Sequence, residues 1–429
     1  MSKKRVLVYP CGTEIGLEIY RSVSHSIHYE LVGGSSTYDH GRFVYKQHID
    51  NLPFITDEST SNDIVEFNRI LIENDIDFLY PAMDGVLYKF SEFRNLISCE
   101  VICPSFDTAK ITRSKKETYE FFEGIINTPR LYAQEEVNPS LYPLFVKPDV
   151  GQGSVGTARI NSDMDLMQYY QTSCSKMLLM EYLPGEEYTV DCFTNNEGRL
   201  VYVGGRGRKR IKNGISVNSV GVDDQEFYNI AQIINSKIKQ RGGWFFQVKK
   251  DLNGNYSLLE IASRIAGASA YTRSLGVNLP LMTLFIYSGQ DIESVLKNDY
   301  TIELDRALYN SFRLELDYRY VYVDYDDTII IDGNINTTLV SYLYQCLNNG
   351  IKIILITKHD GDLKTDLQKY RIYELFDEII HINKSEEKYL YITNKDAIFI
   401  DDSYGEREKV KNHCEINVFD PHMIEVLIE

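Results

Sequence analysis

Two sets of residues in this chain have the types and spacing that phosphate and metal chemistry requires. The first begins with the apolar residues 144–146, which lead to Lys147 and then to a loop that contains Gly151, Gly153 and Gly156. Glycines let backbone N–H groups approach an anion closely, and a lysine ammonium is a compact charge suited to phosphate oxygens. Taken alone, the loop is also compatible with a flexible hairpin.

Carboxylate and amide side chains further along the chain favour a phosphate-binding loop over a flexible hairpin. Glu187 lies about forty residues after the lysine, and Gln247 and Glu260 lie on two later β-rich runs. A carboxylate accepts hydrogen bonds from ribose hydroxyls, and carboxylate and amide oxygens are ligands for a hard cation. Together with the lysine and the glycine loop, these residues predict a site for a nucleotide and Mg²⁺.

The second set lies near the C-terminus. Asp324 and Asp326 follow the apolar residues 320–323 in an Asp-x-Asp-x-Thr pattern, Thr357 ends a second apolar run, and Asp401 opens an acidic pair after a third. In α/β sheets, ligands bind at the carboxyl ends of the strands, where these residues are expected to lie. Because neighbouring carboxylates repel one another unless a cation joins them, the cluster predicts a magnesium site.

Short β-rich runs that alternate with helical patterns are expected to position these residues. In the N-terminal part, residues 5–9, 29–33 and 76–81 read as strands and residues 15–23 as a helix. This alternation is typical of βαβ units and a parallel sheet. The glycines after the first strand lack the GxGxxG spacing, which favours a tight turn over a dinucleotide fingerprint.

The middle and the end of the chain follow different patterns. Residues 245–248 and 256–261 predict an antiparallel pair, because Asn253-Gly254 between them is a strong hairpin signal. The stretch 291–317 is mixed and is expected to connect two bodies. A fresh alternation of strands and helices begins at Tyr318 and runs to the C-terminus.

Length and composition limit the class of protein. The 429 residues suggest about three domains. A formal net charge of −17 disfavours binding to nucleic acids and to anionic membranes. The seven cysteines are scattered without a CxxC pair, no apolar run reaches the roughly 18 residues of a membrane span, and no secretory signal is recognised. We therefore expect a cytoplasmic protein with no membrane partner.

The order of motifs over about residues 1–290 resembles the ATP-grasp superfamily, especially its carboxylate–amine ligases and its carbamoyl-phosphate-synthase and biotin-carboxylase branches. The resemblance implies ATP and Mg²⁺ as cofactors. The nucleotide-binding residues that it implies are Lys115, Lys147, Gly151, Gly153, Ser154, Gly156, Glu181, Leu183, Glu187, Arg208 and Arg210.

The same resemblance implies how the nucleotide is held. Lys115 and Lys147 would contact its phosphates, although Lys116 adjoins the first of them. Glu181 and the backbone of Leu183 would face the adenine, and the later carboxylate Glu187 would face the ribose.

Two arginines of a basic run are further candidates. Residues 206–212 hold five cations in an otherwise acidic protein, and the resemblance implies that Arg208 and Arg210 face phosphate or substrate. A solvated basic hairpin is the alternative interpretation.

The sequence departs from the family pattern at the metal site. Where the family usually has Glu-x-Asn-x-Arg, this chain has Glu260, Ala262 and Arg264 at the three defining positions. By resemblance, Gln247 and Glu260 would bind Mg²⁺ and Arg264 would stabilise the transferring phosphoryl group. An alanine offers no oxygen, so water and phosphate would supply the remaining ligands.

Residues 318–429 resemble the haloacid-dehalogenase-like (HAD) phosphohydrolases, because all four motifs appear in order. The resemblance implies that Asp324 is the nucleophile and Asp326 the general acid and base. Thr357 and a lysine would hold the phosphate; Lys388 is preferred and Lys384 is the alternative. Asp401 would bind magnesium with Asp324 and Asp326. About 110 residues leave little room for a cap, which favours a large substrate or one presented by another domain.

We therefore expect an α/β protein in three parts. These are a Rossmann-like pre-ATP-grasp domain (1–108), an ATP-grasp domain (109–300, with a lid at about 115–190) and a HAD-like domain (318–429). The expected function is a carboxylate–amine ligase that forms an acyl phosphate, fused to a phosphatase. The partners are a small carboxylate, an amine and a phosphorylated metabolite; homo-oligomerisation is left open. The alternative is a phosphatase whose ATP-grasp region only recognises nucleotide or substrate.

Overall fold

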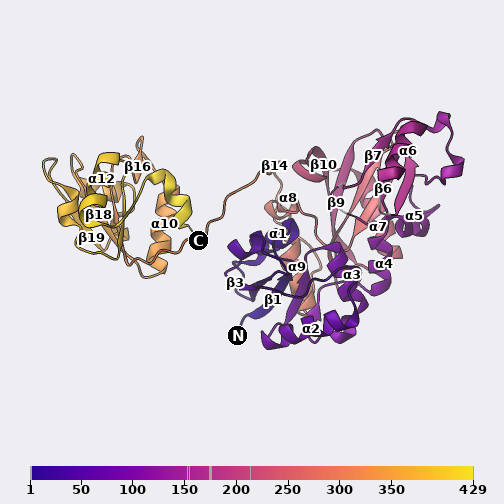
Figure 1. Ribbon diagram of the computed structural model, residues 1–429, viewed down its shortest axis with the longest axis horizontal. Helices are drawn as coiled ribbons and strands as arrows, with labels where there is room; N and C mark the ends of the chain where they lie inside the picture. Colours follow the sequence, from indigo (N-terminus) through magenta and orange to yellow (C-terminus); the bar gives the residue numbers. More distant parts are fainter. Residues whose placement is uncertain (1, 152, 154, 173–175, 213, 429) are drawn as a thin grey trace. The chain divides into compact units, whose positions relative to one another are not determined.

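The computed structural model of the chain describes residues 2–151, 153, 155–172, 176–212 and 214–428 (Figure 1). Contacts between residues divide it into two compact units, residues 1–309 and 310–429. None of the helices in the described ranges is long and apolar enough to cross a membrane.

A parallel sheet of five strands begins the first unit, in the order β3-β2-β1-β4-β5. Its strands are β1 (Lys4–Tyr9), β2 (Tyr29–Gly34), β3 (Gln47–Ile49), β4 (Phe78–Pro81) and β5 (Glu100–Val101). The predicted N-terminal parallel sheet is thus confirmed. The chain reverses its direction across the sheet between β1 and β4, and a crevice for ligands is expected at such a point.

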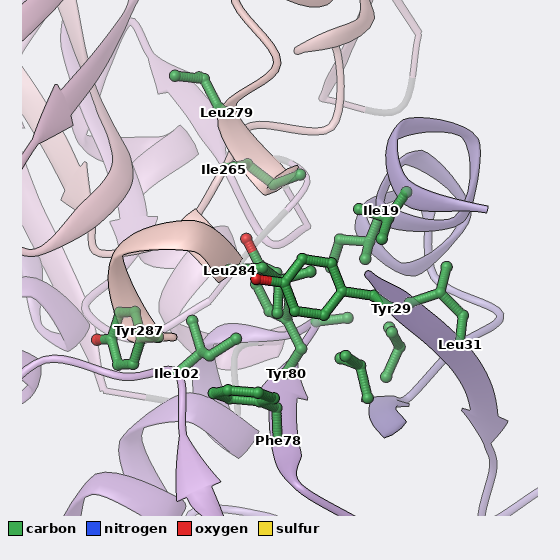
Figure 2. Packing of buried hydrophobic residues seen from close by; sticks show 14 of the residues in the cluster. Ile19, Tyr29, Leu31, Phe78, Tyr80, Ile102, Ile265, Leu279, Leu284 and Tyr287 are labelled. Carbon is green, nitrogen blue, oxygen red and sulfur yellow. The ribbon is translucent and has the colours of Figure 1, made fainter. Parts of the chain in front are cut away.

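Alternating side chains of the central strand connect this sheet to helices on both faces. Val6 and Val8 pack with residues of α1 (Glu14–Val23) and α9 (Leu279–Tyr287), and Figure 2 shows part of this cluster around Tyr29, Phe78 and Leu284. Leu7 and Tyr9 point to the other face and pack with α2 (Ser61–Glu73) and α3 (Asp84–Glu92). In the chain, α1 follows β1 and α3 follows β4, so the N-terminal ends of these helices follow two adjacent strands.

A small antiparallel sheet follows, in the order β7-β6-β8. Its strands are β6 (Leu144–Pro148), β7 (Ala158–Ile160) and β8 (Met177–Glu181), with α6 (Asp163–Thr172) beside them. It is preceded by α4 (Phe106–Arg113) and α5 (Lys115–Phe122). The predicted glycine loop connects β6 to β7.

The largest sheet of the unit is antiparallel and has the order β13-β12-β9-β10-β11-β14. Its strands are β9 (Glu187–Thr194), β10 (Leu200–Lys212), β11 (Ile215–Val222), β12 (Gly242–Lys250), β13 (Tyr256–Ala262) and β14 (Glu303–Asp305). The helix α7 (Gln225–Lys237) packs on one face. The predicted hairpin of β12 and β13 is confirmed, and its register places Gln247 opposite Glu260.

The second unit is built on a parallel sheet with the order β19-β18-β15-β20-β21. Its strands are β15 (Tyr320–Val323), β18 (Lys352–Thr357), β19 (Glu378–His381), β20 (Ala397–Ile400) and β21 (Asn417–Phe419). Val321 and Val323 pack with α10 (Thr337–Asn348) and α11 (Leu363–Lys369), whereas Tyr322 packs with α12 (Tyr404–Cys414). A short hairpin of β16 (Ile330–Ile331) and β17 (Asn334–Ile335) follows β15.

Candidate functional site

A cavity of about 160 Å³ lies between the small antiparallel sheet and the large one. It brings together most residues of the predicted nucleotide site, although they are far apart in the sequence. The predicted residues that line it are Lys115, Lys147, Gly151, Gly153, Glu181, Leu183, Glu187, Arg208, Gln247 and Glu260. The described lining residues do not include Gly156, Arg210 or Arg264, and Ser154 lies outside the described residues.

Lys147 is the most constrained cation of this cavity. It stands on β6 with only 8% of its surface exposed, and its ammonium donates to the hydroxyl of Tyr119 at 2.7 Å and to the carbonyl of Leu259 at 3.4 Å. Burial lowers the pKa of Lys147 to about 7, and the nearby charge of Lys115 adds to this effect. An anion in the cavity would restore the full charge of this lysine.

The second lysine reaches the cavity from the first turn of α5. The Lys115 ammonium lies 3.4 Å from the carbonyl oxygens of Asp149 and Gly151, at the start of the glycine loop. Its neighbour Lys116 pairs instead with Glu120 on the exposed side of the same helix, at 3.4 Å. The structure therefore brings Lys115, and not Lys116, to the cavity.

Three neighbouring strands supply a charged network on the opposite wall. Arg208 on β10 forms an ion pair with Glu187 on β9 and donates to Gln247 on β12 at 3.1 Å and to the carbonyl of Gly214 at 2.6 Å. Lys249 lies 3.9 Å from the same glutamate. The carboxylate predicted to hold the ribose is thus fixed by two cations.

The oxygen donors for a metal come from the hairpin. Gln247 and Glu260 are register partners, and both line the cavity, so an amide oxygen and a carboxylate are available to Mg²⁺. Ala262 is buried in an apolar cluster with Phe245 and Ala266. The described residues therefore fit a magnesium ion that takes its other ligands from phosphate and water.

Arg210 is not brought to this site, and a β-bulge explains why. Alternation along a strand predicts that Arg208 and Arg210 share a face, but the pairing of β10 with β11 shifts its register between them. The Arg210 side chain is 59% exposed and pairs with Asp305 at 2.7 Å. The interpretation as a solvated basic residue holds for Arg210 and fails for Arg208.

A second, larger cavity of about 380 Å³ shares walls with the first, among them Gln247 and Glu260. It is also lined by Thr13 and Asp84, at the N-terminal ends of α1 and α3. Arg264 lines this second cavity and makes a two-pronged ion pair with Asp84. The predicted phosphoryl-stabilising arginine thus lies where the two cavities adjoin.

Sequence reasoning missed two further arginines of this second cavity. Arg206 is buried against Asp191, with their side-chain atoms 3.1 Å apart. Arg306 follows the edge strand β14 and donates to Glu14 at 2.9 Å and to the carbonyl of Ser216 at 3.4 Å. The spacing of two between Arg206 and Arg208 was the available signal for the first, whereas a three-residue strand gave no signal for the second.

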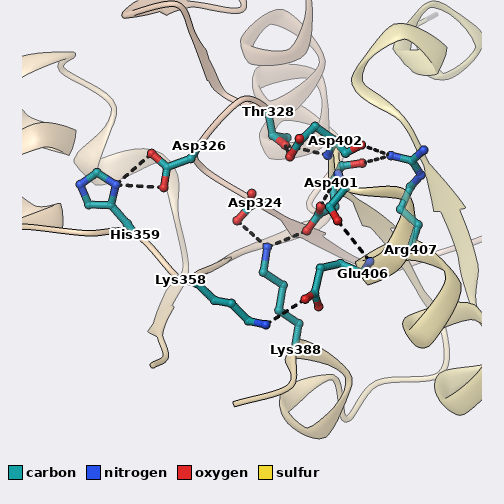
Figure 3. Close-up of polar contacts among 11 residues, drawn as sticks. Asp324, Asp326, Thr328, Lys358, His359, Lys388, Asp401, Asp402, Glu406 and Arg407 are labelled. Carbon is teal, nitrogen blue, oxygen red and sulfur yellow. Dashed lines mark hydrogen bonds and ion pairs between the residues drawn. The ribbon is translucent and has the colours of Figure 1, made fainter. Parts of the chain in front are cut away.

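In the second unit, the predicted residues gather at the carboxyl ends of three adjacent strands. Asp324 follows β15, Thr357 ends β18 and Asp401 follows β20. The Lys388 ammonium lies 2.6 Å from a carboxylate oxygen of Asp324 and 2.6 Å from one of Asp401, as Figure 3 shows. Lys384 is exposed and pairs with Asp360 instead. Of the two alternatives, the structure therefore brings Lys388 to the cluster.

The electrostatics of this cluster follow from its burial. Burial raises the pKa of Asp324 to about 7, although the charge of Lys388 opposes the shift, and burial likewise raises the pKa of Asp401. Ligand oxygens of Asp324, Asp401 and Asp402 lie within 4.8 Å of one another, which fits a magnesium ion. The buried hydroxyl of Thr357 has no hydrogen-bond partner among the described residues and is free for a phosphate oxygen.

The prediction that Asp326 binds the metal is not supported by its position. The carboxylate of Asp326 turns to His359, whose Nδ1 lies 2.9 Å and 3.0 Å from its two oxygens, and Asp402 stands with Asp324 and Asp401 in its place. Sequence reasoning missed His359, although it stands only two residues after Thr357. Burial lowers the pKa of this imidazole and the adjoining carboxylates of Asp326 and Asp366 raise it, with a net rise.

Comparison with known proteins places the first unit in a known fold. Residues 173–307 match a family model described as ATP-grasp in the biosynthetic pathway with Ter operon. A search of curated proteins gave no match.

Solved structures resemble the chain at low sequence identity. One is the biotin carboxylase domain of 2-oxoglutarate carboxylase from Hydrogenobacter thermophilus, in complex with MgADP, ADP and bicarbonate. It has a TM-score of 0.56 and 13% sequence identity, and the match covers 70% of this chain and 72% of the carboxylase chain. N5-carboxyaminoimidazole synthetase from Staphylococcus aureus, complexed with ADP, has a TM-score of 0.56 and 14% sequence identity; the match covers 69% of this chain and 80% of the synthetase. The L-amino acid ligase of Bacillus licheniformis has a TM-score of 0.54 and 15% sequence identity; the match covers 68% of this chain and 75% of the ligase. These similarities show that the chain has the ATP-grasp fold.

Proposed function

We propose that the first unit, which contains the ATP-grasp fold, is an ATP- and magnesium-dependent ligase that joins a carboxylate to an amine. The observation that carries this proposal is the convergence of Lys147, Glu187 and Glu260 on one cavity. ADP and magnesium occur in structures of the same fold, such as the 2-oxoglutarate carboxylase domain.

The charges of the two cavities support a definite sequence of steps. The substrate carboxylate attacks the γ-phosphorus of ATP and ADP leaves. The amine nitrogen then attacks the acyl carbon, the bond from that carbon to phosphate breaks, and the amine proton passes to the departing phosphate or to water. Lys147 and Arg264 would stabilise the charge on the transferring phosphoryl group. Gln247 and Glu260 would hold Mg²⁺, which supplies further charge neutralisation when bound.

Release of ADP tests this proposal directly. Purified protein incubated with ATP, Mg²⁺ and a panel of carboxylates and amines should release ADP and phosphate only with a matching pair of substrates. The Lys147→Met variant is the control, because it lacks the buried cation of the nucleotide cavity. Absence of any nucleotide binding by calorimetry would contradict the ligase assignment.

The larger cavity is proposed to hold the carboxylate substrate, and two arginines offer a matched test. Arg306 follows the short strand β14, and the Arg210 side chain pairs with Asp305 at the end of that strand. Each arginine pairs with one carboxylate, but of the two only Arg306 lines the cavity. Because a hydrogen bond to a charged group is worth about 1.5–3 kcal/mol, Arg306→Gln should lower the rate of ADP release about tenfold or more. Arg210→Gln should stay within about twofold of the native rate; equal effects would argue against this placement.

For the second unit, we propose a magnesium-dependent phosphohydrolase of the HAD type. Asp324 would attack phosphorus, and Lys388 and Thr357 would hold phosphate oxygens. The 2.6 Å contact between Asp324 and Lys388 supports this, as does the Thr357 hydroxyl, which has no hydrogen-bond partner among the described residues. Asp324 and Asp401 would hold Mg²⁺, with Asp402 replacing Asp326 in the predicted ligand set. The Asp326 carboxyl would give a proton to the leaving oxygen and take one from water.

The second candidate function is a phosphatase whose ATP-grasp unit only senses nucleotide or substrate. Ala262 favours this function, because an alanine side chain has no oxygen and so cannot supply the metal ligand of the family pattern. Lys147→Met separates the two functions. A ligase variant would lose ADP formation, whereas a passive sensor would never form ADP and would keep phosphate-ester hydrolysis.

A further inference from the structure

His359 is held between two carboxylates next to the proposed phosphatase centre. Its Nδ1 faces both oxygens of Asp326, and its Nε2 lies 3.0 Å from an oxygen of Asp366 on α11. The imidazole ring and the ring of Tyr325 make an edge-to-face contact, with centroids 5.0 Å apart. Only 12% of its side chain is exposed. These contacts fix both the position and the rotation of the imidazole ring.

Asp326 and Asp324 lie at different depths although they are two residues apart. The Asp324 side chain is 8% exposed and the Asp326 side chain is 52% exposed. Figure 3 shows Asp324 directed to Lys388 and Asp326 directed away from it, to His359. In an in-line displacement, the leaving oxygen departs on the side opposite the nucleophile. A phosphate that rests on the buried Asp324 would therefore direct its ester oxygen outward, toward the exposed carboxyl of Asp326.

We propose that His359 is a positioning residue that holds the Asp326 carboxyl where it can protonate the leaving oxygen. Asp366 in turn orients His359. The inference rests on the proposed phosphatase function and predicts that His359 matters most for phosphate esters of alcohols. An alkoxide is a strong base and needs a proton as it departs, whereas nitrophenolate is a stable anion and does not.

The proton balance of the step is complete with Asp324, Asp326 and water. An oxygen of Asp324 bonds to phosphorus, the phosphorus–ester bond breaks, and the ester oxygen takes the proton of Asp326. Asp326 then removes a proton from water, which attacks the phosphoryl group and releases phosphate and the Asp324 carboxylate. Loss of His359 can slow both proton transfers, but kcat/KM covers only the steps up to departure of the ester oxygen. It should therefore fall for an ester with a poor leaving group and change little for one with a good leaving group.

Two substrates therefore test the inference. For His359→Ala, we expect kcat/KM for glycerol phosphate to fall about tenfold or more, and kcat/KM for p-nitrophenyl phosphate to change less than about threefold. His359→Asn should recover part of the loss, because its side-chain amide can donate near the position of Nδ1. Asp366→Asn should show a smaller loss of the same selectivity. His422→Asn is the control, because His422 is exposed and also pairs with an aspartate, Asp420.

The outcomes separate this inference from the function on which it rests. Selective loss with the alkyl ester supports the positioning role. Equal loss with both esters, no loss, or a gain overturns it while leaving the phosphatase assignment intact. If native protein hydrolyses neither ester with Mg²⁺, the phosphatase proposal itself fails. Should His359→Ala not fold, the same comparison is made with His359→Asn, for which a selective loss of at least threefold is required.

Discussion

Replacing Lys147 with methionine should weaken binding of a magnesium-bound, non-hydrolysable ATP analogue by about tenfold to a hundredfold. This range corresponds to the loss of one hydrogen bond to a charged group in a buried site, about 1.5–3 kcal/mol. Isothermal titration calorimetry measures the effect. Lys116→Met is the matched control, because this lysine is in the same helical turn as Lys115 but pairs with Glu120 outside the cavity.

The same lysine predicts the pH dependence of nucleotide binding. Burial lowers the pKa of Lys147 to about 7, so the empty cavity loses its charged ammonium as the pH rises through 7. A bound triphosphate favours the charged form, so binding above pH 7 must take up a proton. We therefore expect affinity to fall as pH rises from about 7 to 9, by at most one decade per pH unit.

Buffers with different ionisation enthalpies reveal this proton uptake in the calorimeter. At pH 8, native protein should take up close to one proton per nucleotide more than Lys147→Met does. Equal uptake in the two proteins would show that Lys147 stays charged in the empty cavity, or does not meet the phosphates, and would contradict this prediction.

The parts of the two sites that sequence could predict are those fixed by local rules. Asp324, Thr357 and Asp401 each follow an apolar run, and parallel strands bring their ends to one edge of a sheet. The pairing of Gln247 with Glu260 follows from a hairpin that Asn253-Gly254 signals. In both cases the relevant contacts are set by strand ends and strand register, which the sequence pattern contains.

The parts of the two sites that the sequence could not predict depend on irregular strand pairing or on contacts between distant segments. The bulge that removes Arg210 from the cavity has no marker in the basic run, because alternation is the default for a strand. Arg306 reaches the cavity because β14 pairs with β11 at the edge of the large sheet, and three residues are too few to give a periodic pattern. The contact of His359 with Asp326 could not be predicted, because it depends on how the loops after β15 and β18 meet.

The choice between neighbouring lysines also needed the fold. Lys388 lies in a short 3-10 turn and is buried against two carboxylates, whereas Lys384 stands four residues earlier and is exposed. Both lie between the second and third apolar runs, so spacing alone does not distinguish them. Burial decides, because an ammonium is stable in that position only when carboxylates pair with it.

Asp324→Asn should lower magnesium-dependent hydrolysis of p-nitrophenyl phosphate by about a thousandfold or more, because an amide cannot replace the attacking carboxylate. Release of nitrophenolate measures the rate. Asp396→Asn is the control: Asp396 adjoins the other end of β20, is half exposed and lies close to Arg319. Retained turnover in Asp324→Asn would exclude this residue as the nucleophile.

A stability measurement ensures that lost turnover does not reflect lost folding. Because burial raises the pKa of Asp324 to about 7, its folded state favours the neutral acid, and the stability from this group is lost as pH rises from about 4 through 7. Asp401 still pairs with Lys388 in the variant. At pH 7.5 without Mg²⁺, a neutral asparagine should therefore leave the melting temperature equal to or above that of native protein. Added Mg²⁺ stabilises whichever protein binds it, so it should raise the native melting temperature more than that of Asp324→Asn. Equal responses to Mg²⁺ would argue that Asp324 is not a ligand, even if the rate falls, and would leave Asp401 and Asp402 to hold the ion.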